Sequence, residues 1–324
     1  MAENHNRHKK SRIRINLEYY GFLLLYKLLH RLSLRSGYRI SCALLQLLMH
    51  FDRRHHNRTV NHLLHAGFCS TRREAVRFAR RSYTEFGKLI VEIVKMDQLY
   101  SPDRIFVEGP EATLDYMLPE RNPEGPRNVI IATAHLGNWE VAGTAFAEKN
   151  GVPMTSLMRA FSNPRIGELI LAHRAGAMHS LADKTKGVRP LLRALLNRET
   201  ATVLIDQHAS NREGVVCEFF GHPARVHMTP ALLHLKTGVP ILPELTVRRP
   251  GDNFEFTIEV DDLIRYTPTG DKNRDVQELT QLCISRLEAM IRRHPEQWLW
   301  APRHWLDIDR RCAAQYRDWK PRRG

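Results

Sequence analysis

The stretch Ile130-Ile-Ala-Thr-Ala-His-Leu-Gly-Asn-Trp-Glu-Val141 joins an apolar run to a histidine, a glycine, and a glutamate five residues past the histidine. The run has the length of one buried strand, and Asn138 is a suitable N-cap for a helix behind it. Gly137 permits a tight turn between the two, because glycine adopts backbone angles that other residues resist. The stretch therefore predicts a strand that leads directly into a helix.

The same alternation continues to the end of the chain, after a loop rich in proline and glycine at residues 119–126. Strand-length apolar runs occupy residues 129–133, 152–158, 202–205, 215–220, 239–247 and 254–260. Helical patterns occupy residues 138–149, 164–174, 187–197, 229–236 and 275–293. This order predicts an α/β fold in which helices cover a mixed, mostly parallel sheet that begins after the loop.

The N-terminal third differs from this pattern, because its sequence predicts helices and no strands. We therefore expect a helical, membrane-associated region at residues 1–100 and an α/β domain at residues 101–324. A weak helical pattern occupies residues 40–49, and Ser70 or Thr71 is the N-cap of a longer one that ends near Met96.

The first helical pattern, residues 17–34, is amphipathic. Lys27, His30 and Arg31 share one face. The opposite face holds Phe22, Leu25, Leu29 and Leu32. The longest stretch of this helix without a charged residue, residues 19–26, is far shorter than the roughly 20 apolar residues that span a bilayer. The pattern favours a helix in the membrane interface, although an ordinary helix packed on a core fits it equally well.

The amino-acid composition indicates which classes of partner molecule the chain could bind. The chain carries 49 Lys and Arg against 35 Asp and Glu, a formal net charge of +14, which favours nucleic acid, anionic lipid or an acidic carrier protein. Its five cysteines form no CxxC pair, so neither a disulfide framework nor a zinc ribbon is expected, and a reducing compartment fits best. The charged start leads into a leucine-rich stretch without a cleavage site, so we expect it to stay cytosolic.

His135 and Glu140 carry the predicted chemistry. His135 falls at a strand end, where α/β sheets bind ligands, and Glu140 falls in the first helical turn, from where it could orient the imidazole. The chain has no GxSxG motif, so a substrate hydroxyl deprotonated by His135 would attack an acyl carbonyl directly. Backbone N–H groups around Gly137 and Asn138, or a nearby arginine, would hold the oxyanion. The spacing alone equally fits a histidine and a glutamate with purely structural roles.

Several further motifs accompany this pair. In order they are His135-Leu-Gly-Asn-Trp-Glu140, Arg159-Ala-Phe-Ser-Asn163-Pro164, Arg174-Ala-Gly176, Asp206-Gln207, Phe219-Phe-Gly221, Thr237-Gly-Val-Pro240 and Pro295-Glu-Gln-Trp-Leu-Trp300. In this order they resemble the late acyltransferases of bacterial lipid A biosynthesis, the lauroyl or myristoyl transferases. The resemblance runs from about Leu17 to Trp305.

This resemblance implies an O-acyltransferase with the glycerolipid-acyltransferase α/β fold at the cytoplasmic face of the inner membrane. It implies acyl carrier protein or acyl-CoA as the donor and a lipid A precursor or related glycolipid as the acceptor, without metal or cofactor. His135 matches the base and Glu140 its partner. Expected substrate-binding residues are Gly137, Asn138, Arg159, Asn163, Arg174, Asp206 and Gln207.

Among these residues, Arg159 and Arg174 match family arginines near the acceptor and the reacting carbonyl, and ordinary surface ion pairing is the alternative. Asp206 ends an apolar strand, so it should face the same crevice as His135 and orient an arginine or the acceptor sugar; simple helix capping is the alternative.

The chain departs from the family pattern at three places. His208 stands where the family has an aspartate, and Pro302-Arg303-His304 stands where it has a His-Arg-Arg run. The family's membrane-spanning N-terminal helix is only weakly present, which favours peripheral or shallow attachment.

Three other classes of protein compete with this interpretation. The charge fits a nucleic-acid-binding protein, but no zinc finger, RRM signature or aromatic-interleaved basic strand supports one, so we expect no nucleic acid. Seventeen histidines suggest a metalloenzyme, and His62 and His65 could share a helix face, but no carboxylate or cysteine completes a set at ligand spacing. A non-catalytic lipid-binding relative also fits, and it predicts that loss of His135 leaves function intact.

Overall fold

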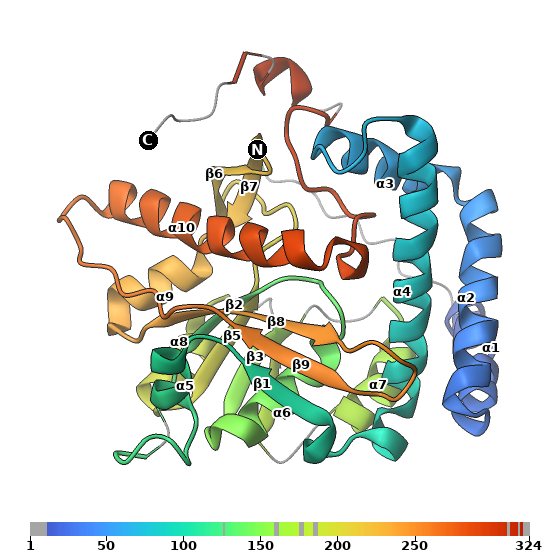
Figure 1. Cartoon of the computed structure of the whole chain (residues 1–324), viewed down its shortest axis with the longest axis horizontal. Coiled ribbons are helices and arrows are strands. Elements are labelled where there is room, and N and C mark those ends of the chain that lie inside the picture. The colour runs from blue at the N-terminus through green and yellow to red at the C-terminus, as the bar shows by residue number, and fades with distance from the viewer. Residues whose placement is uncertain are drawn as a thin grey trace.

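A computed structural model describes residues 12–125, 127–158, 162–174, 178–183, 187–309, 312–316 and 318–319. Its centre is a seven-stranded sheet with the strand order β1-β9-β8-β2-β5-β3-β4 (Figure 1). The strands are β1 Ile105–Glu108, β2 Ile130–Thr133, β3 Met154–Met158, β4 His179–Asp183, β5 Thr200–Leu204, β8 Ile241–Arg248 and β9 Phe256–Val260. Neighbouring strands run parallel except for β8 and β9, which confirms the predicted mixed, mostly parallel sheet.

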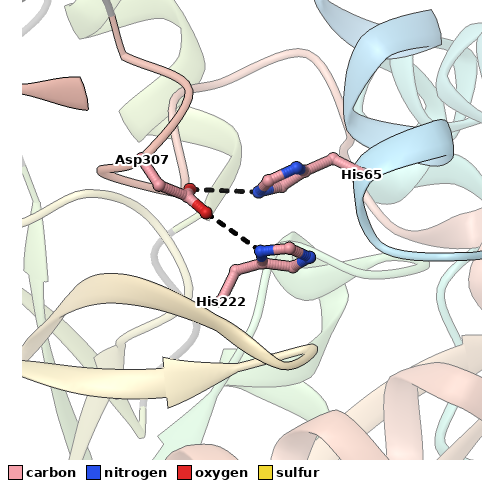
Figure 2. A group of neighbouring side chains, drawn as sticks. All are labelled: His65, His222 and Asp307. Atoms are coloured by element: carbon pink, nitrogen blue, oxygen red, sulfur yellow. Dashed lines mark hydrogen bonds and ion pairs between the residues drawn. The ribbon is translucent and has the colours of Figure 1, made fainter. Parts of the chain in front are cut away.

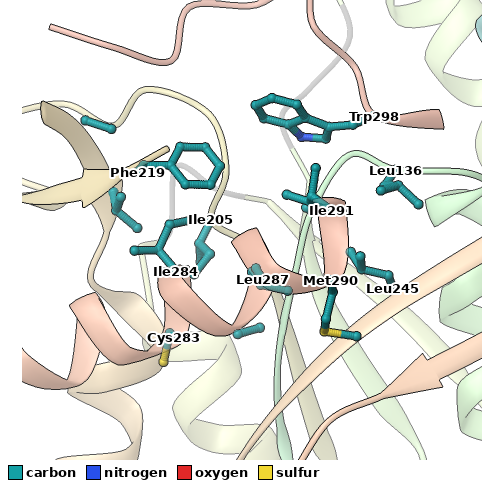
Figure 3. Close-up of a cluster of buried hydrophobic side chains, with 14 of the residues drawn as sticks. Leu136, Ile205, Phe219, Leu245, Cys283, Ile284, Leu287, Met290, Ile291 and Trp298 are labelled. Carbon is teal, nitrogen blue, oxygen red and sulfur yellow. The ribbon is translucent and has the colours of Figure 1, made fainter. Parts of the chain in front are cut away.

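Helices cover both faces of this sheet. They are α5 Glu111–Met117, α6 Trp139–Asn150, α7 Pro164–Arg174, α8 Arg189–Leu196, α9 Thr229–Thr237 and α10 Lys272–Arg293. Side chains alternate across a strand, so Ile130 of β2 belongs to the core shared with α8, α9 and α10, whereas Ile131 belongs to the core shared with α5 and α6. Figure 3 shows the first of these cores, in which Leu287 and Ile291 of α10 lie among buried side chains that include Trp298.

Four helices precede the sheet: α1 Arg12–Arg31, α2 Leu34–Phe51, α3 Arg53–His65 and α4 Arg72–Leu99. Thr71 caps α4 in a capping box with Glu74, which confirms one of the two predicted N-caps. Figure 1 shows α4 standing between the sheet and α2. Within the described residues, none of the helices combines the length and apolarity needed to cross a membrane. Membrane association of this region and the boundary near residue 100 therefore stay predictions.

Two predictions about the strands were wrong. The sheet begins before the proline-rich loop, because β1 pairs with β9. The run at residues 215–220 does not join the main sheet, because β6 Gly214–Phe219 pairs with β7 His222–His227 in a separate antiparallel hairpin. Short 3₁₀ segments, η1 Pro102–Arg104, η3 Pro295–Gln297 and η4 Ala313–Tyr316, complete the described elements.

Candidate active site

The centre of the candidate site lies at the carboxyl ends of two neighbouring strands, β2 and β5. Their register pairs Thr133 with Leu204, so the residues two positions further on, His135 and Asp206, come side by side. His135 Nδ1 lies 2.7 Å from Asp206 Oδ1, and the backbone N–H of His135 donates to Asp206 Oδ2 over 3.1 Å. These contacts confirm that Asp206 lies beside His135 at the ends of the two strands.

Asp206 is held as an anion by its surroundings, although its side chain is fully buried. Burial opposes ionisation, but His135, His304 and the hydrogen bond from Trp298 together lower the pKa of Asp206 to about 2. Trp298 Nε1 donates to Oδ2 over 2.9 Å, and His304 Nδ1 lies 3.0 Å from the Asp206 carbonyl oxygen. An anionic Asp206 favours the tautomer with hydrogen on Nδ1 of His135, which leaves the Nε2 lone pair available to accept a proton.

The carboxylate on the imidazole is therefore Asp206, and the prediction that Glu140 orients His135 was wrong. Glu140 lies in the first turn of α6, where its Oε1 accepts a hydrogen bond from Trp139 Nε1 over 3.0 Å. The strand register brings Asp206 onto Nδ1 of His135 instead. Glu140 still lines the same cavity as His135, so its participation in the reaction stays a prediction with a different geometry.

The backbone N–H groups of Gly137 and Asn138 hold the turn together. Gly137 donates to the carbonyl of Gln297 and Asn138 to the carbonyl of Thr246, each over 3.0 Å. Gly137 has φ +58°, and a Cβ there would lie 2.1 Å from the Thr246 oxygen, so only glycine fits. Because both N–H groups are already donated, the prediction that they hold an oxyanion was wrong.

Asn138 ties this turn to the N-terminal helices. Its side-chain oxygen accepts from the N–H groups of Glu140 and Val141, which confirms the predicted N-cap. Its amide donates over 3.0 Å to Glu92 of α4. Glu92 is fully buried and forms a bidentate ion pair with Arg248 of β8. A buried charge network therefore fixes the start of α6 against α4.

A cavity of about 200 Å³ begins at His135 and runs between α6 and the sheet. It extends to Ile131, two residues before the end of β2. Its lining is mostly apolar, with Leu157, Leu181, Leu204, Phe146 and Met154 among its members. A mostly apolar lining with a histidine beside it suits an apolar ligand whose polar end lies near the imidazole.

The lining of the same cavity also includes polar side chains. Ser156 Oγ lies 2.8 Å from Nε2 of His179, which can approach α6 closely because Gly143 has no side chain. Glu244 lines the cavity as well, and burial raises its pKa to about 7 although hydrogen bonds from Thr246 and Thr133 oppose the rise. Glu244 is therefore substantially protonated near neutral pH.

The other predicted substrate-binding residues do not line this cavity or lie outside the described part of the chain. Asn163 is 3% exposed, and its amide donates over 2.8 Å to the carbonyl of Ile15, so it fastens α1 to the start of α7. Gln207 follows Asp206 and is partly exposed. Arg159 and the side chain of Arg174 lie outside the described residues.

Sequence reasoning missed two supports of Asp206, namely Trp298 and His304. Trp298 stands within the motif at residues 295–300, so its position in that motif was the available signal. His304 stands where the chain departs from the family pattern, and its carbonyl partner 98 residues away gave no local signal. Both residues are buried at 1% exposure, so they act through Asp206 and not by contact with a substrate.

Comparison with known proteins gives two kinds of match. The sequence model of one family, described as bacterial lipid A biosynthesis acyltransferase, matches residues 6–307. Relatives named phosphatidylinositol mannoside acyltransferase, from two strains of Mycobacterium tuberculosis, are 26% identical over 192 residues, which cover 58% of this chain and 58% of theirs. The relative of that name from Mycolicibacterium smegmatis is 25% identical over 183 residues, which cover 56% of this chain and 57% of its own. The chain thus spans somewhat more than half the length of these relatives.

Proposed function

Because the family model covers residues 6–307, the chain belongs to the bacterial lipid A biosynthesis acyltransferase family, and on that premise we propose that it moves a fatty acyl chain from a thioester to a glycolipid hydroxyl. The observation that carries the proposal is the pair of His135 and ionised Asp206 beside a mostly apolar cavity. Within the described part of the chain, no hydrogen-bond partner occupies Nε2 of His135.

The reaction follows from this geometry. Nε2 of His135 accepts the proton of the acceptor hydroxyl while the hydroxyl oxygen bonds to the thioester carbonyl carbon. The tetrahedral intermediate then collapses by cleavage of its carbon–sulfur bond, and the imidazolium returns the proton to the leaving thiolate. Asp206 stabilises the imidazolium between these steps, because it is ionised and in contact with Nδ1. We assign the oxyanion or a substrate phosphate to Arg159 or Arg174, since a guanidinium suits both.

The cavity behind His135 is the proposed site of the acyl chain, and two substitutions at its far end test this. Ile131→Phe shortens the space and should shift the transferred chains toward shorter lengths. Met154→Ala lengthens it and should shift them toward longer ones, at a stability cost of about 2–5 kcal/mol. Mass spectrometry of the products reads the shift. Loss of stability alone would change the two profiles in the same direction, which would contradict the assignment.

The acceptor class rests on the relatives. Their printed name says that they acylate phosphatidylinositol mannoside, and the family's description refers to lipid A, so both acceptors are glycolipids. We propose a lipid A precursor or a phosphatidylinositol mannoside-like lipid. The donor is acyl carrier protein or acyl-CoA, and the net charge of +14 would attract either of these anionic donors.

The N-terminal helices supply a surface for the cytoplasmic face of the inner membrane. Leu17 and Leu24 of α1 are 71% and 73% exposed, and Leu47 and Phe51 of α2 are 56% and 78% exposed. Basic residues on α1 are also exposed, namely Arg12, Arg14, Lys27 and Arg31. Apolar side chains with basic neighbours fit a helix that lies in the interface of an anionic membrane. We therefore propose peripheral or shallow attachment through α1 and α2.

Vesicle sedimentation tests this attachment with a matched pair of variants. Leu24→Asp should weaken binding to vesicles that contain anionic lipid by about tenfold or more, because it places a charge among the exposed leucines of α1. Leu196→Asp on α8 is the control, since Leu196 is similarly exposed at 70% but lies on another helix. Binding of the wild type should also fall with salt. Equal binding by both variants would contradict attachment through α1.

The activity itself is tested with purified protein. The wild type receives acyl carrier protein or CoA thioesters together with a lipid A precursor or phosphatidylinositol mannoside, and one donor–acceptor combination should yield an acylated glycolipid. His135→Ala should lose about two to four orders of magnitude in rate. His294→Ala is the control, because His294 pairs with Glu259 outside the site. Full activity of His135→Ala would contradict His135 as the base, and absence of product from the wild type with every combination would support the alternative of a non-catalytic lipid-binding relative.

A further inference from the structure

A second cluster of histidines and a carboxylate lies outside the candidate active site (Figure 2). His65 is the last residue of α3, His222 is the first residue of β7, and Asp307 follows Trp305 in the C-terminal segment. His65 Nε2 lies 3.0 Å from Asp307 Oδ1, and His222 Nδ1 lies 2.9 Å from Asp307 Oδ2. Three segments that are far apart in the sequence therefore meet at one carboxylate.

The geometry of the cluster suits a metal ion. One nitrogen from each ring and one carboxylate oxygen lie within 4.8 Å of one another. Ligand atoms about 2.0–2.1 Å from a tetrahedral zinc ion are about 3.3 Å apart. Each ring nitrogen lies nearly that far from an oxygen of Asp307, His65 from Oδ1 and His222 from Oδ2. The two imidazole rings stack with their centroids 3.5 Å apart, which brings both rings close to the one carboxylate.

We propose that His65, His222 and Asp307 bind a divalent transition metal of the zinc class. Two imidazole nitrogens and one carboxylate oxygen are typical zinc ligands, whereas magnesium and calcium prefer oxygen alone. A cavity of about 500 Å³ borders the cluster and gives room for a water molecule as the fourth ligand. His62, which sequence reasoning paired with His65, takes no part, because its Nδ1 bonds to the Trp300 carbonyl over 2.8 Å and burial lowers its pKa to about 3.

The metal would have a structural role and would take no part in the transfer reaction. It would link α3, the β6–β7 hairpin and the C-terminal segment. Trp305, two residues before Asp307, packs edge-on against the ring of His65 at 5.4 Å between centroids. The neighbouring His304 bonds to the carbonyl of Asp206. Binding would therefore stabilise the segment that supports the catalytic pair, without contacting the substrate.

Zinc binding to purified full-length protein tests the proposal without reference to activity. After removal of metal with a chelator, titration with zinc chloride should give one zinc per chain and raise the Tm by several degrees. His222→Ala should weaken zinc binding by more than about 100-fold, because loss of a ligand exceeds the 10–100-fold effect of losing an outer-shell partner. Asp307→Asn, which keeps the side-chain shape, should weaken it as well.

The control is again His294→Ala. His294 Nε2 lies 2.7 Å from Glu259, and its side chain is 27% exposed, close to the 31% of His222. This variant should bind zinc like the wild type. Absence of stoichiometric zinc in the wild type, equal binding by folded His222→Ala or Asp307→Asn, or equal loss in the control would overturn the proposal. An X-ray absorption spectrum that shows sulfur ligands would overturn it as well.

Discussion

Replacing Asp206 with asparagine should slow acyl transfer by about three to four orders of magnitude while the protein stays folded. Asp206 Oδ2 accepts from Trp298 and from the His135 backbone, and Oδ1 receives the Nδ1–H of His135. Asparagine has one oxygen, so it keeps the first two bonds only by turning its NH₂ group toward Nδ1. The imidazole then carries its hydrogen on Nε2, where the acceptor hydroxyl must lose its proton.

The magnitude follows from this change of tautomer. A loss of 10³–10⁴ in rate corresponds to about 4–5.5 kcal/mol of transition-state stabilisation. The folded protein should lose about 2 kcal/mol of unfolding free energy at neutral pH, because the pKa of Asp206 is about 2 against an ordinary 3.8. That stability is present above pH 3.8 and is lost as the pH falls through about 2. The unfolding free energy of the variant should therefore lack this decrease at acid pH.

The assay measures transfer rate on purified wild-type and Asp206→Asn protein, with urea unfolding beside it. Glu259→Gln is the matched control, because Glu259 forms a histidine–carboxylate contact of 2.7 Å with His294 outside the site. The control should keep the wild-type rate. A folded Asp206→Asn protein that works within tenfold of the wild type would refute the assignment of the base and its tautomer.

Three further predictions concern the buried charges and the turn around the site. Glu244→Gln should raise the unfolding free energy above pH 7 by about 3 kcal/mol. The pKa of Glu244 is raised from 4.5 to about 7, so the protonated carboxyl contributes its full stability below pH 4.5, and this stability is lost as the pH rises through 7. Urea unfolding as a function of pH measures the difference. Arg248→Met should lower the unfolding free energy by about 3–5 kcal/mol, because it leaves the Glu92 carboxylate buried without its cation. Denaturant titration measures the loss, and a change below about 1 kcal/mol would contradict this prediction. Gly137→Ala should lower the unfolding free energy by at least about 2 kcal/mol and reduce the transfer rate, because the added Cβ would clash with the Thr246 carbonyl oxygen. A variant with wild-type stability and activity would contradict this prediction.

Local signals in the sequence predicted the elements that carry the site. The apolar run and the glycine turn gave β2 and the start of α6, and the N-cap at Asn138 formed as expected. The elements that escaped prediction include two short, polar strands. Residues 179–183 and 222–227, the strands β4 and β7, contain histidines and charged residues and show little hydrophobic alternation. Their pairing partners, and not their own composition, make them strands.

The partner of His135 could not be assigned from local spacing. Glu140 is five residues away in the sequence and Asp206 is 71 residues away, so local reasoning favoured Glu140. The register of β2 against β5 decides the contact, and register is a property of the assembled sheet. The same limit hid the contact of Asp307 with His65 and His222, because its three residues come from separate elements. The family resemblance predicted His135 as the base, and the structure shows which carboxylate lies beside it.

The most direct test of the central claim is mass spectrometry of total lipids from cells with the wild-type gene, without it, and with His135→Ala at equal protein level. The account predicts that one glycolipid in the wild type carries one acyl group more than in the other two strains. An unchanged lipid profile in all three strains, or a His135→Ala profile identical to that of the wild type, would contradict it.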